Sequence, residues 1–406
     1  MIVYQPVPLN RVQLGREFPV DVWSSDGRLL LRRGQVLQSE SHRDMLAMHK
    51  ACMTESDAIA WQKSLERTMR RMRASGVDML TIAAAPMPSD ILDHDYMEGT
   101  QVKGDWLDLQ EILRGLLYQG TDAIMPIVRL EGIAQKVTSL LKTDPDDSLF
   151  VLFQALPDLN QGYCATHALL CAAVCMLTMQ KLEQPEDSID TLLRAALLMN
   201  IGMAQSQDHM ARQHKPPNKQ QRQIIDEHPP ISTNILGSFG LNDDVLLHLV
   251  QWHHAPGAAP MHNEHATPLH LLHLADCQIA KLASRASRPA LSALRAAQSL
   301  VLTSPSQTTE MNSALVAVLS FYPPGTYVQL ANGETAVVIQ RGLRANAPHV
   351  ASIINASGMP LSKYIYHDTS DTHAPQYAVR SPLPNQTVRC LVNLEKIRRL
   401  RGVAIR

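Results

Sequence analysis

The stretch ATHALLCAAVCMLTMQKL (165–182) and the stretch IDTLLRAALLMNIGMA (189–204) decide the fold of this chain. In both of them, apolar residues recur every three to four positions, which is the period of an α-helix with a buried face. The same spacing recurs in LQEILRGLLYQG (109–120), DDVLLHLVQWHH (243–254) and PLHLLHLADCQIAKLA (268–283). The sequence therefore predicts a central all-helical domain, which we place at residues 100–320.

One long polar segment interrupts the helical pattern, from Gln205 to Arg222. It contains Pro216 and Pro217, and two consecutive prolines exclude a continuous helix through the segment. We therefore expect a surface loop here, with Lys215 and Lys219 close to any pocket of the helical domain.

The segments on either side of the helical domain have the features of small β-containing modules. FPVDVWSSDGRLLLRRGQVL (18–37) predicts two short strands around an Asp-Gly turn, a helical pattern follows from Glu40 to Arg73, and a loop follows at 83–89. In YPPGTYVQLANGETAVVIQRG (322–342), alternating apolar residues flank Asn332-Gly333, which indicates a hairpin. We predict a mainly α protein, with a hairpin and helix module at 1–85 and a β-rich module at 321–406.

Composition limits the classes of partner. Charged residues make up 18% of the 406 residues and the formal net charge is −1, so no overall field attracts DNA or an anionic membrane. No stretch has the roughly 18 apolar residues of a spanning helix, and the first residues lack a leader pattern. We expect a cytoplasmic protein without membrane insertion or DNA binding. Cys164, Cys171 and Cys175 fit no zinc pattern and are expected to be reduced core residues.

Histidines and one aspartate at or near the ends of helical patterns suggest a site. These residues are His167, His228, His253, His254 and Asp276. Imidazoles and carboxylates gathered between helices are usual ligands of divalent transition metals. A pair of such metals hydrolyses phosphodiesters well, because both ions stabilise the attacking and leaving oxygens. However, the chain has 17 histidines, and any one of them taken alone is more often a surface or core residue.

The order of these landmarks resembles the HD-GYP family, a branch of the HD phosphohydrolases that cleave cyclic di-GMP. The resemblance covers about residues 105–320 and rests on ATHALL, AALLMNIGMA, IIDEHPPISTNIL, VLLHLVQWHH and LLHLADCQIAKLASRASRPA. It implies a helical domain that holds two or three metal ions. It also implies that the metal ligands include His167, His228, His253, His254 and Asp276.

The departures from the family pattern are specific. Met199 and Asn200 stand at the defining His-Asp pair, and Met203 replaces the following lysine. A thioether is a soft ligand, asparagine cannot bridge two cations with a negative charge, and methionine cannot neutralise phosphate. Tyr163 stands where some relatives have a metal-binding glutamate, and the Gly-Tyr-Pro motif is missing after His254. The resemblance therefore implies a degenerate catalytic site.

Three basic residues follow Asp276: Lys281, Arg285 and Arg288. Their spacing would present them on one side of a helix or of its end. In the family that the chain resembles, cations in this region contact the nucleotide's phosphates. The alternative is a solvated basic face.

We expect either no metal or a single divalent ion, Fe, Mn or Zn, held by His228, His253, His254 and Asp276. In the alternative arrangement, the histidines bond to one another, to backbone carbonyls and to Asp276 in a polar core. The leading hypothesis is a cytoplasmic signalling protein with a catalytically degenerate domain that binds cyclic di-GMP or a signalling protein. Two alternatives stay open: an active phosphohydrolase that uses the remaining ligands, and a scaffold that binds neither metal nor nucleotide.

Overall fold

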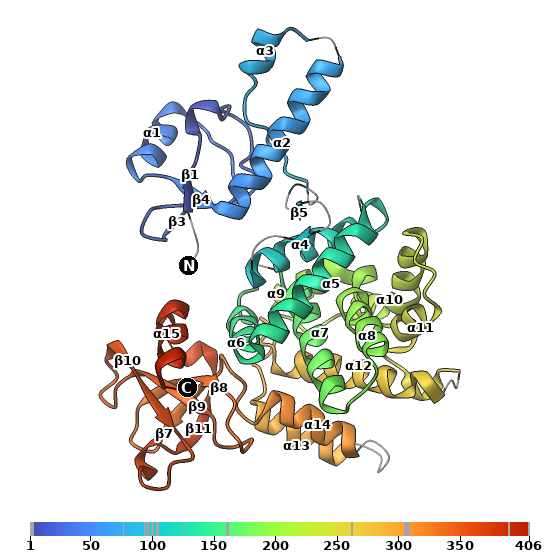
Figure 1. Ribbon diagram of the computed structural model, residues 1–406, viewed down its shortest axis with the longest axis vertical. Coiled ribbons are helices and arrows are strands. Elements are labelled where there is room, and N and C mark those ends of the chain that lie inside the picture. Colours follow the sequence, from blue (N-terminus) through green and yellow to red (C-terminus); the bar gives the residue numbers. More distant parts are fainter. Residues whose placement is uncertain are drawn as a thin grey trace. The chain divides into compact units, whose positions relative to one another are not determined.

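The computed structural model describes residues 4–75, 77–92, 95, 97–98, 101–102, 105–123, 125–159, 162–260, 263–303, 309–388 and 390–404. The chain forms two compact units, Met1–Asp108 and Leu109–Arg406, which we describe separately. As predicted, the protein is mainly α, with small antiparallel sheets in its N- and C-terminal regions (Figure 1).

The first unit contains a four-stranded antiparallel sheet in the order β1-β4-β2-β3. Its elements are β1 (Tyr4–Pro6), β2 (Val22–Trp23), β3 (Leu29–Leu31), α1 (Glu40–Met48), β4 (Cys52–Thr54), α2 (Glu55–Ala74), α3 (Met79–Ala83), β5 (Met97–Glu98) and β6 (Gln101–Val102). The predicted hairpin is confirmed as β2 and β3, and Gly27 has the positive φ of 83° that the turn requires.

The uniform helical pattern predicted from Glu40 to Arg73 is wrong in its middle, where strand β4 separates α1 from α2. Lys50 has a φ of 50° and turns the chain after α1. Cys52 and Met53 are buried in the sheet, and the Thr54 side chain then caps α2 by accepting a hydrogen bond from the Asp57 backbone N–H. Buried strand residues thus continue an apolar spacing that looks helical in the sequence.

The loop at 83–89 packs against α2. The Trp61 Nε1 donates a hydrogen bond to the Pro88 carbonyl at 2.8 Å, and the Trp61 ring meets Phe18 edge to face with 6.0 Å between ring centroids. Both aromatic side chains are fully buried, so the loop completes the core of the first unit.

Helices dominate the second unit. They are α4 (Trp106–Gln119), whose first residues belong to the first unit, α5 (Pro126–Thr143), α6 (Pro145–Ala155), α7 (Tyr163–Lys181), α8 (Glu186–Leu198), α9 (Ala204–Arg212), α10 (Lys219–Ser238), α11 (Asp244–Trp252), α12 (Asn263–Leu282), α13 (Ala293–Thr303) and α14 (Thr309–Leu319). The described 3-10 turns of the chain are η1 (Leu9–Arg11), η3 (Gly120–Asp122), η4 (Ile201–Met203), η5 (Pro256–Ala258), η7 (Pro375–Tyr377) and η8 (Asn385–Thr387).

Helix α7 is the core of the helical part. It packs against α6, α8, α9, α12 and α14 and is buried along most of its length (Figure 1). By length and composition alone this helix could cross a membrane, which differs from our expectation, but most of it is covered by other parts of the protein. Cys164, Cys171 and Cys175 are free thiols with no exposed surface, which confirms their assignment to the core.

The predicted loop from Gln205 to Arg222 is wrong for most of its length. Residues up to Arg212 form α9, and only residues 213–218 lie outside a helix before Asn218 caps α10. The error arises because a buried polar residue looks like a loop residue in the sequence. Asp208 is 1% exposed, and it accepts hydrogen bonds from the Tyr118 hydroxyl and the Cys164 backbone N–H, both at 2.6 Å.

The C-terminal part of the second unit is a five-stranded antiparallel sheet in the order β10-β9-β8-β7-β11, followed by a helix. Its elements are β7 (Tyr327–Leu330), β8 (Thr335–Gln340), β9 (His349–Ile354), β10 (Pro360–Asp368), β11 (Val379–Leu383) and α15 (Leu394–Ala404). Strands β7 and β8 form the predicted hairpin around Asn332-Gly333, and Gly333 has a φ of 89°. Helix α15 packs on β10.

This sheet is fixed to helix α6. The side chains of Arg341, Arg398 and Arg401 pair with Asp146, Asp147 and Asp144 at the start of α6, at distances of 2.6, 2.7 and 2.9 Å. Phe150 of α6 belongs to the apolar core of the sheet. The backbones approach so closely that a Cβ on Gly325, before β7, would lie 2.6 Å from the Phe150 carbonyl oxygen.

Candidate metal centre

Two buried histidines face each other in the helical part of the second unit. His228 lies in α10 and His253 directly follows α11, and their Nε2 atoms are 3.2 Å apart. Each Nδ1 lies close to a backbone carbonyl oxygen of its own helix, 2.6 Å for His228 and 2.7 Å for His253. A carbonyl oxygen only accepts, so each Nδ1 carries the ring proton and donates it. Two Nε2 lone pairs are therefore directed at each other.

A shared proton does not resolve this contact. Burial lowers the pKa of His228 to about 4 and that of His253 to about 3, so both rings are neutral near pH 7. The exposed His254 completes a three-histidine group, with its ring centroid 4.9 Å from that of His228 and 4.4 Å from that of His253. One ligand nitrogen from each of the three lies within 4.8 Å of the others. A cation bound there would turn the facing lone pairs from repulsive to attractive.

A second set of possible ligands consists of His167, Cys171 and Asp276, which we call the Asp276 group. The His167 Nε2 lies 2.8 Å from the Asp276 Oδ1, and its Nδ1 lies 3.3 Å from the Tyr163 hydroxyl. Arg285 donates to the same hydroxyl at 3.1 Å. The hydroxyl thus accepts from Arg285 and donates to the His167 Nδ1, which leaves the Nε2–H to donate to the carboxylate. Both nitrogens of His167 are satisfied within the protein.

Asp276 couples the two groups electrostatically. Burial alone would raise the pKa of Asp276, but the hydrogen bond from His167 and the nearby imidazoles hold it well below its usual range. The carboxylate is therefore ionised. Burial lowers the pKa of all three histidines, and the negative charge of Asp276 partly offsets this by raising the pKa of His228, His253 and His254. The three-histidine group therefore has an anionic oxygen within electrostatic reach.

Met199 and Asn200 lie next to the turn that carries His228. Ser232 in α10 donates to the Met199 carbonyl at 2.9 Å and accepts from the Gly202 N–H at 3.0 Å. A Cβ on Gly202 would lie 2.9 Å from the His228 carbonyl oxygen, so only glycine allows this approach. The segment with Met199 and Asn200 therefore packs directly on the turn of α10 that carries His228.

Asn200 keeps an unused amide. Its side chain is 2% exposed, and neither the oxygen nor the nitrogen of the amide has a hydrogen-bond partner among the described residues. Leaving such a group buried and unpaired costs about 1–3 kcal/mol. Met199 and Met203 are also buried and, being thioethers, supply no charge.

The three-histidine group fits a divalent metal. Metal-binding histidines usually donate their other ring N–H to a carbonyl or carboxylate, as His228 and His253 do here. Three imidazoles with a nearby carboxylate suit zinc, iron or manganese. The Asp276 group offers less, because burial raises the pKa of the Cys171 thiol well above its usual value and His167 is already bonded. The alternative of an internally bonded polar core thus describes the Asp276 group better than the three-histidine group.

The three basic residues lie at and beyond the end of one helix. Helix α12 ends at Leu282, and Arg285 and Arg288 lie beyond it, joined by a β-bridge. Lys281 donates to the Ser299 hydroxyl at 2.8 Å, and Arg288 donates to the Ala280 carbonyl. All three cations therefore have partners within the protein. Lys215 and Lys219 are exposed.

Sequence reasoning missed two contributions to the site. Cys171 was assigned to the core alone, but its Sγ lies 3.5 Å from the His167 Nε2. Tyr163 was noted only as a replaced glutamate, but its hydroxyl links Arg285 to His167. Tyr163 and Cys171 flank His167 at a spacing of one helical turn in the sequence, which is the signal that could have placed them on the same face.

No protein-family model and no curated protein matches this sequence. Among solved structures, the chain is similar to Bd1817, described as a HDG"Y"P protein from Bdellovibrio bacteriovorus. The match covers 78% of this chain and 99% of that one, with 12% identity and a TM-score of 0.41. At this identity and TM-score, the likeness carries no argument about the site or the activity.

Proposed function

We propose that this chain is a cytoplasmic signalling protein whose helical domain is a degenerate form of an HD-GYP phosphodiesterase. In this proposal the domain holds one divalent metal at the three-histidine group, with Asp276 as the nearby carboxylate, and acts by binding cyclic di-GMP or a signalling protein. The observation that carries the proposal is the contact between two neutral imidazoles whose Nε2 lone pairs face each other at 3.2 Å.

The residues at the degenerate positions favour one metal over two. A second ion would need an anionic bridge and a further hard ligand, but Asn200 is neutral and Met199 offers only a thioether. His167 and Asp276 are hydrogen-bonded to each other. With one ion, the attacking and leaving oxygens of a phosphodiester cannot both be stabilised, so binding without efficient turnover is expected.

The same site has features that suit a phosphate ligand. A bound metal would supply positive charge that attracts and polarises a phosphate oxygen. The unpaired amide of Asn200 can form hydrogen bonds with a polar ligand. Arg285 uses one N–H group for the Tyr163 hydroxyl, and its Nε has no hydrogen-bond partner among the described residues, so it keeps a donor that a phosphate oxygen could accept.

The first test is the metal content of the full chain, purified without chelators and measured by plasma mass spectrometry. We expect about one equivalent of metal, its loss in His253→Ala, and its retention in His209→Ala, which removes an exposed histidine of α9. On the same samples, equilibrium dialysis should detect cyclic di-GMP binding, and product analysis should detect little hydrolysis.

Other outcomes separate the alternatives. Two metals per chain together with rapid turnover would replace this proposal with an active phosphohydrolase. A chain that takes up neither metal nor nucleotide, even after incubation with Zn²⁺, Mn²⁺ and Fe²⁺, would leave the scaffold hypothesis. A protein partner would then have to be found by cross-linking.

A further inference from the structure

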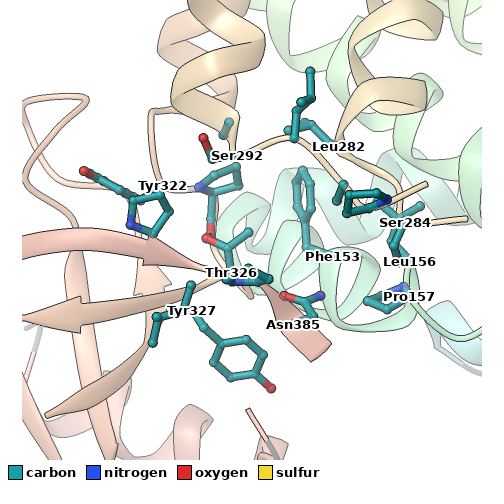
Figure 2. Close-up of a pocket in the computed structure, with 18 of the residues that line it drawn as sticks. Phe153, Leu156, Pro157, Leu282, Ser284, Ser292, Tyr322, Thr326, Tyr327 and Asn385 are labelled. Carbon is teal, nitrogen blue, oxygen red and sulfur yellow. The ribbon is translucent and has the colours of Figure 1, made fainter. Parts of the chain in front are cut away.

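A cavity of about 410 Å³ lies between the helical part of the second unit and its C-terminal sheet. Figure 2 shows Phe153 and Leu282 on the helical side and Thr326 and Tyr327 on the sheet side. The cavity is separate from the metal centre, because none of the proposed metal ligands lines it. Its size falls in the range of about 300–1,000 Å³ that is typical of small-molecule sites.

The walls of the cavity are mainly apolar. Aromatic rings of Phe153, Phe321 and Tyr327 combine with leucines and prolines from both parts of the unit. The sheet is held in place by the ion pairs to α6 described above, so the cavity is part of the folded unit and not a gap between mobile parts. An apolar body of the size of one or two rings, or a short alkyl chain, fits these walls.

The polar groups of the lining indicate which charge a ligand should carry. Arg295 is the one charged residue among the described lining residues, which include no aspartate or glutamate. Its guanidinium is exposed and has no ion pair or hydrogen bond within the described part of the chain. The amide of Asn385 is also in the lining. In contrast, Arg341, Arg398 and Arg401 of the same unit all pair with carboxylates.

Helix α13 adds to this positive potential. Ala293, its first residue, lines the cavity, and Arg295 lies in its first turn. The N-terminal end of a helix presents backbone N–H groups and the positive end of the helix dipole, both of which favour an anion. Here the Arg295 N–H donates to the Ser292 hydroxyl at 3.4 Å, so only the N–H groups before it face a ligand. Two independent features, a free guanidinium and a helix N-terminus, therefore meet an apolar cavity at one side.

We infer that this cavity binds a small amphipathic anion, with a ring system or short alkyl chain against the aromatic walls and one acidic group at Arg295. Leu282, Ser284 and the segment from Pro289 to Ser292 form part of the wall. Arg285 lies between Ser284 and Pro289 in the chain, and its guanidinium donates to the Tyr163 hydroxyl beside His167. A ligand in the cavity thus touches the chain segment that supports the Asp276 group.

The test is a fluorescence titration of the full chain with 1-anilinonaphthalene-8-sulfonate, an aromatic anion of suitable size. We expect saturable binding at one site, weakened about tenfold in Arg295→Ala because a charge-assisted hydrogen bond is lost. Arg344→Ala removes another exposed arginine of the same unit that does not line the cavity, and should leave the affinity unchanged.

A competition experiment tests the acidic group and the cavity separately. Decanoate should displace the dye at lower concentration than decanol, which has the same chain length but no charge. Ser292→Trp should abolish dye binding by filling the cavity. Asn385→Ala should weaken dye binding, and it serves as the test if the tryptophan variant does not fold. Equal competition by decanol and decanoate, or unchanged dye binding in both Arg295→Ala and Asn385→Ala, would overturn the inference. Removing metal with a chelator should not alter dye binding, so this result is independent of the proposed function.

Discussion

The three-histidine group and the Asp276 group contain similar side chains but differ in how their hydrogen bonds are satisfied. In the three-histidine group, His228 and His253 donate to carbonyls of their own helices and direct two acceptors at each other. In the Asp276 group, a chain of hydrogen bonds runs from Arg285 through Tyr163 and His167 to the carboxylate, and both ring nitrogens of His167 have partners. The first arrangement leaves two acceptor nitrogens facing each other, whereas the imidazole of the second has a partner for each nitrogen.

The comparison shows that ligand-type residues alone do not define a metal centre. The partners of the non-ligating atoms decide whether lone pairs remain available. In the three-histidine group, backbone carbonyls hold the ring protons away from the centre. In the Asp276 group, Tyr163 and Arg285 leave His167 with a proton on the nitrogen that faces Asp276.

The largest expected effect is on metal affinity. Loss of a residue that only orients a ligand typically lowers metal affinity by about 10–100-fold. His253→Ala should lower it by more, because a direct ligand is removed. His167→Ala should lower it by about tenfold, because His167 only orients and holds Asp276. Zinc titrations in competition with a chelating dye would measure both. Equal losses in the two variants would show that the two groups form one centre.

Introducing the His-Asp pair of the HD-GYP pattern should add a metal. We expect the double variant Met199→His with Asn200→Asp to bind a second metal, because the two positions lie beside His228 and would supply an imidazole and a bridging carboxylate. Plasma mass spectrometry should then give about two metals per chain. The single variant Met203→Lys, which adds no ligand, serves as the control and should remain at about one.

Acid should destabilise the metal-free protein. His228 and His253 have a pKa of about 4 and about 3 when folded but 6.5 as ordinary histidines, so the unfolded chain takes up protons first. The contribution of the two neutral imidazoles to the free energy of unfolding is therefore fully present above pH 6.5. It falls as the pH drops toward 4, by on the order of 3 kcal/mol for His228 alone. Urea unfolding at pH 7.5, 5.5 and 4.5 would measure the loss. A urea midpoint that stays constant across this range would show that the imidazoles are not buried as described.

The smallest expected effect is that of Tyr163→Phe. The change removes the hydroxyl that accepts from Arg285 and contacts His167, so the free energy of unfolding should fall by about 1–2 kcal/mol. Metal affinity should change little, because the hydroxyl bonds to none of the three histidines. Thermal unfolding and the zinc titration on the same sample separate the two effects, and a large loss of affinity would contradict the separation of the groups.

The helical architecture could be predicted because its helices bury one regular apolar face, as the stretch 165–182 does in α7. The exceptions depend on contacts between residues far apart in the sequence. Asp208 lies in a helix because Tyr118 and Cys164 satisfy its carboxylate, and neither partner can be inferred from the local pattern. Similarly, strand β4 exists because Cys52 pairs with residues of β1 and β2.

The candidate site was predicted as a set of residue types but not as two groups. The order of the landmarks indicated His167, His228, His253, His254 and Asp276, and the structure brings these residues together. Which nitrogen of each ring faces the site depends on the orientation of the side chain and on the nearest carbonyl. That information is absent from residue spacing, so neither the facing Nε2 atoms nor the Tyr163 link could be predicted.

The position of Phe150 makes the helical part and the C-terminal sheet interdependent. Its ring is part of the sheet's core although its backbone belongs to α6. A chain cut after α14 would expose this ring to water and leave the carboxylates of Asp144, Asp146 and Asp147 without their arginines. The two parts should therefore melt in one cooperative transition, and neither could be exchanged for an unrelated module during evolution without redesign of α6.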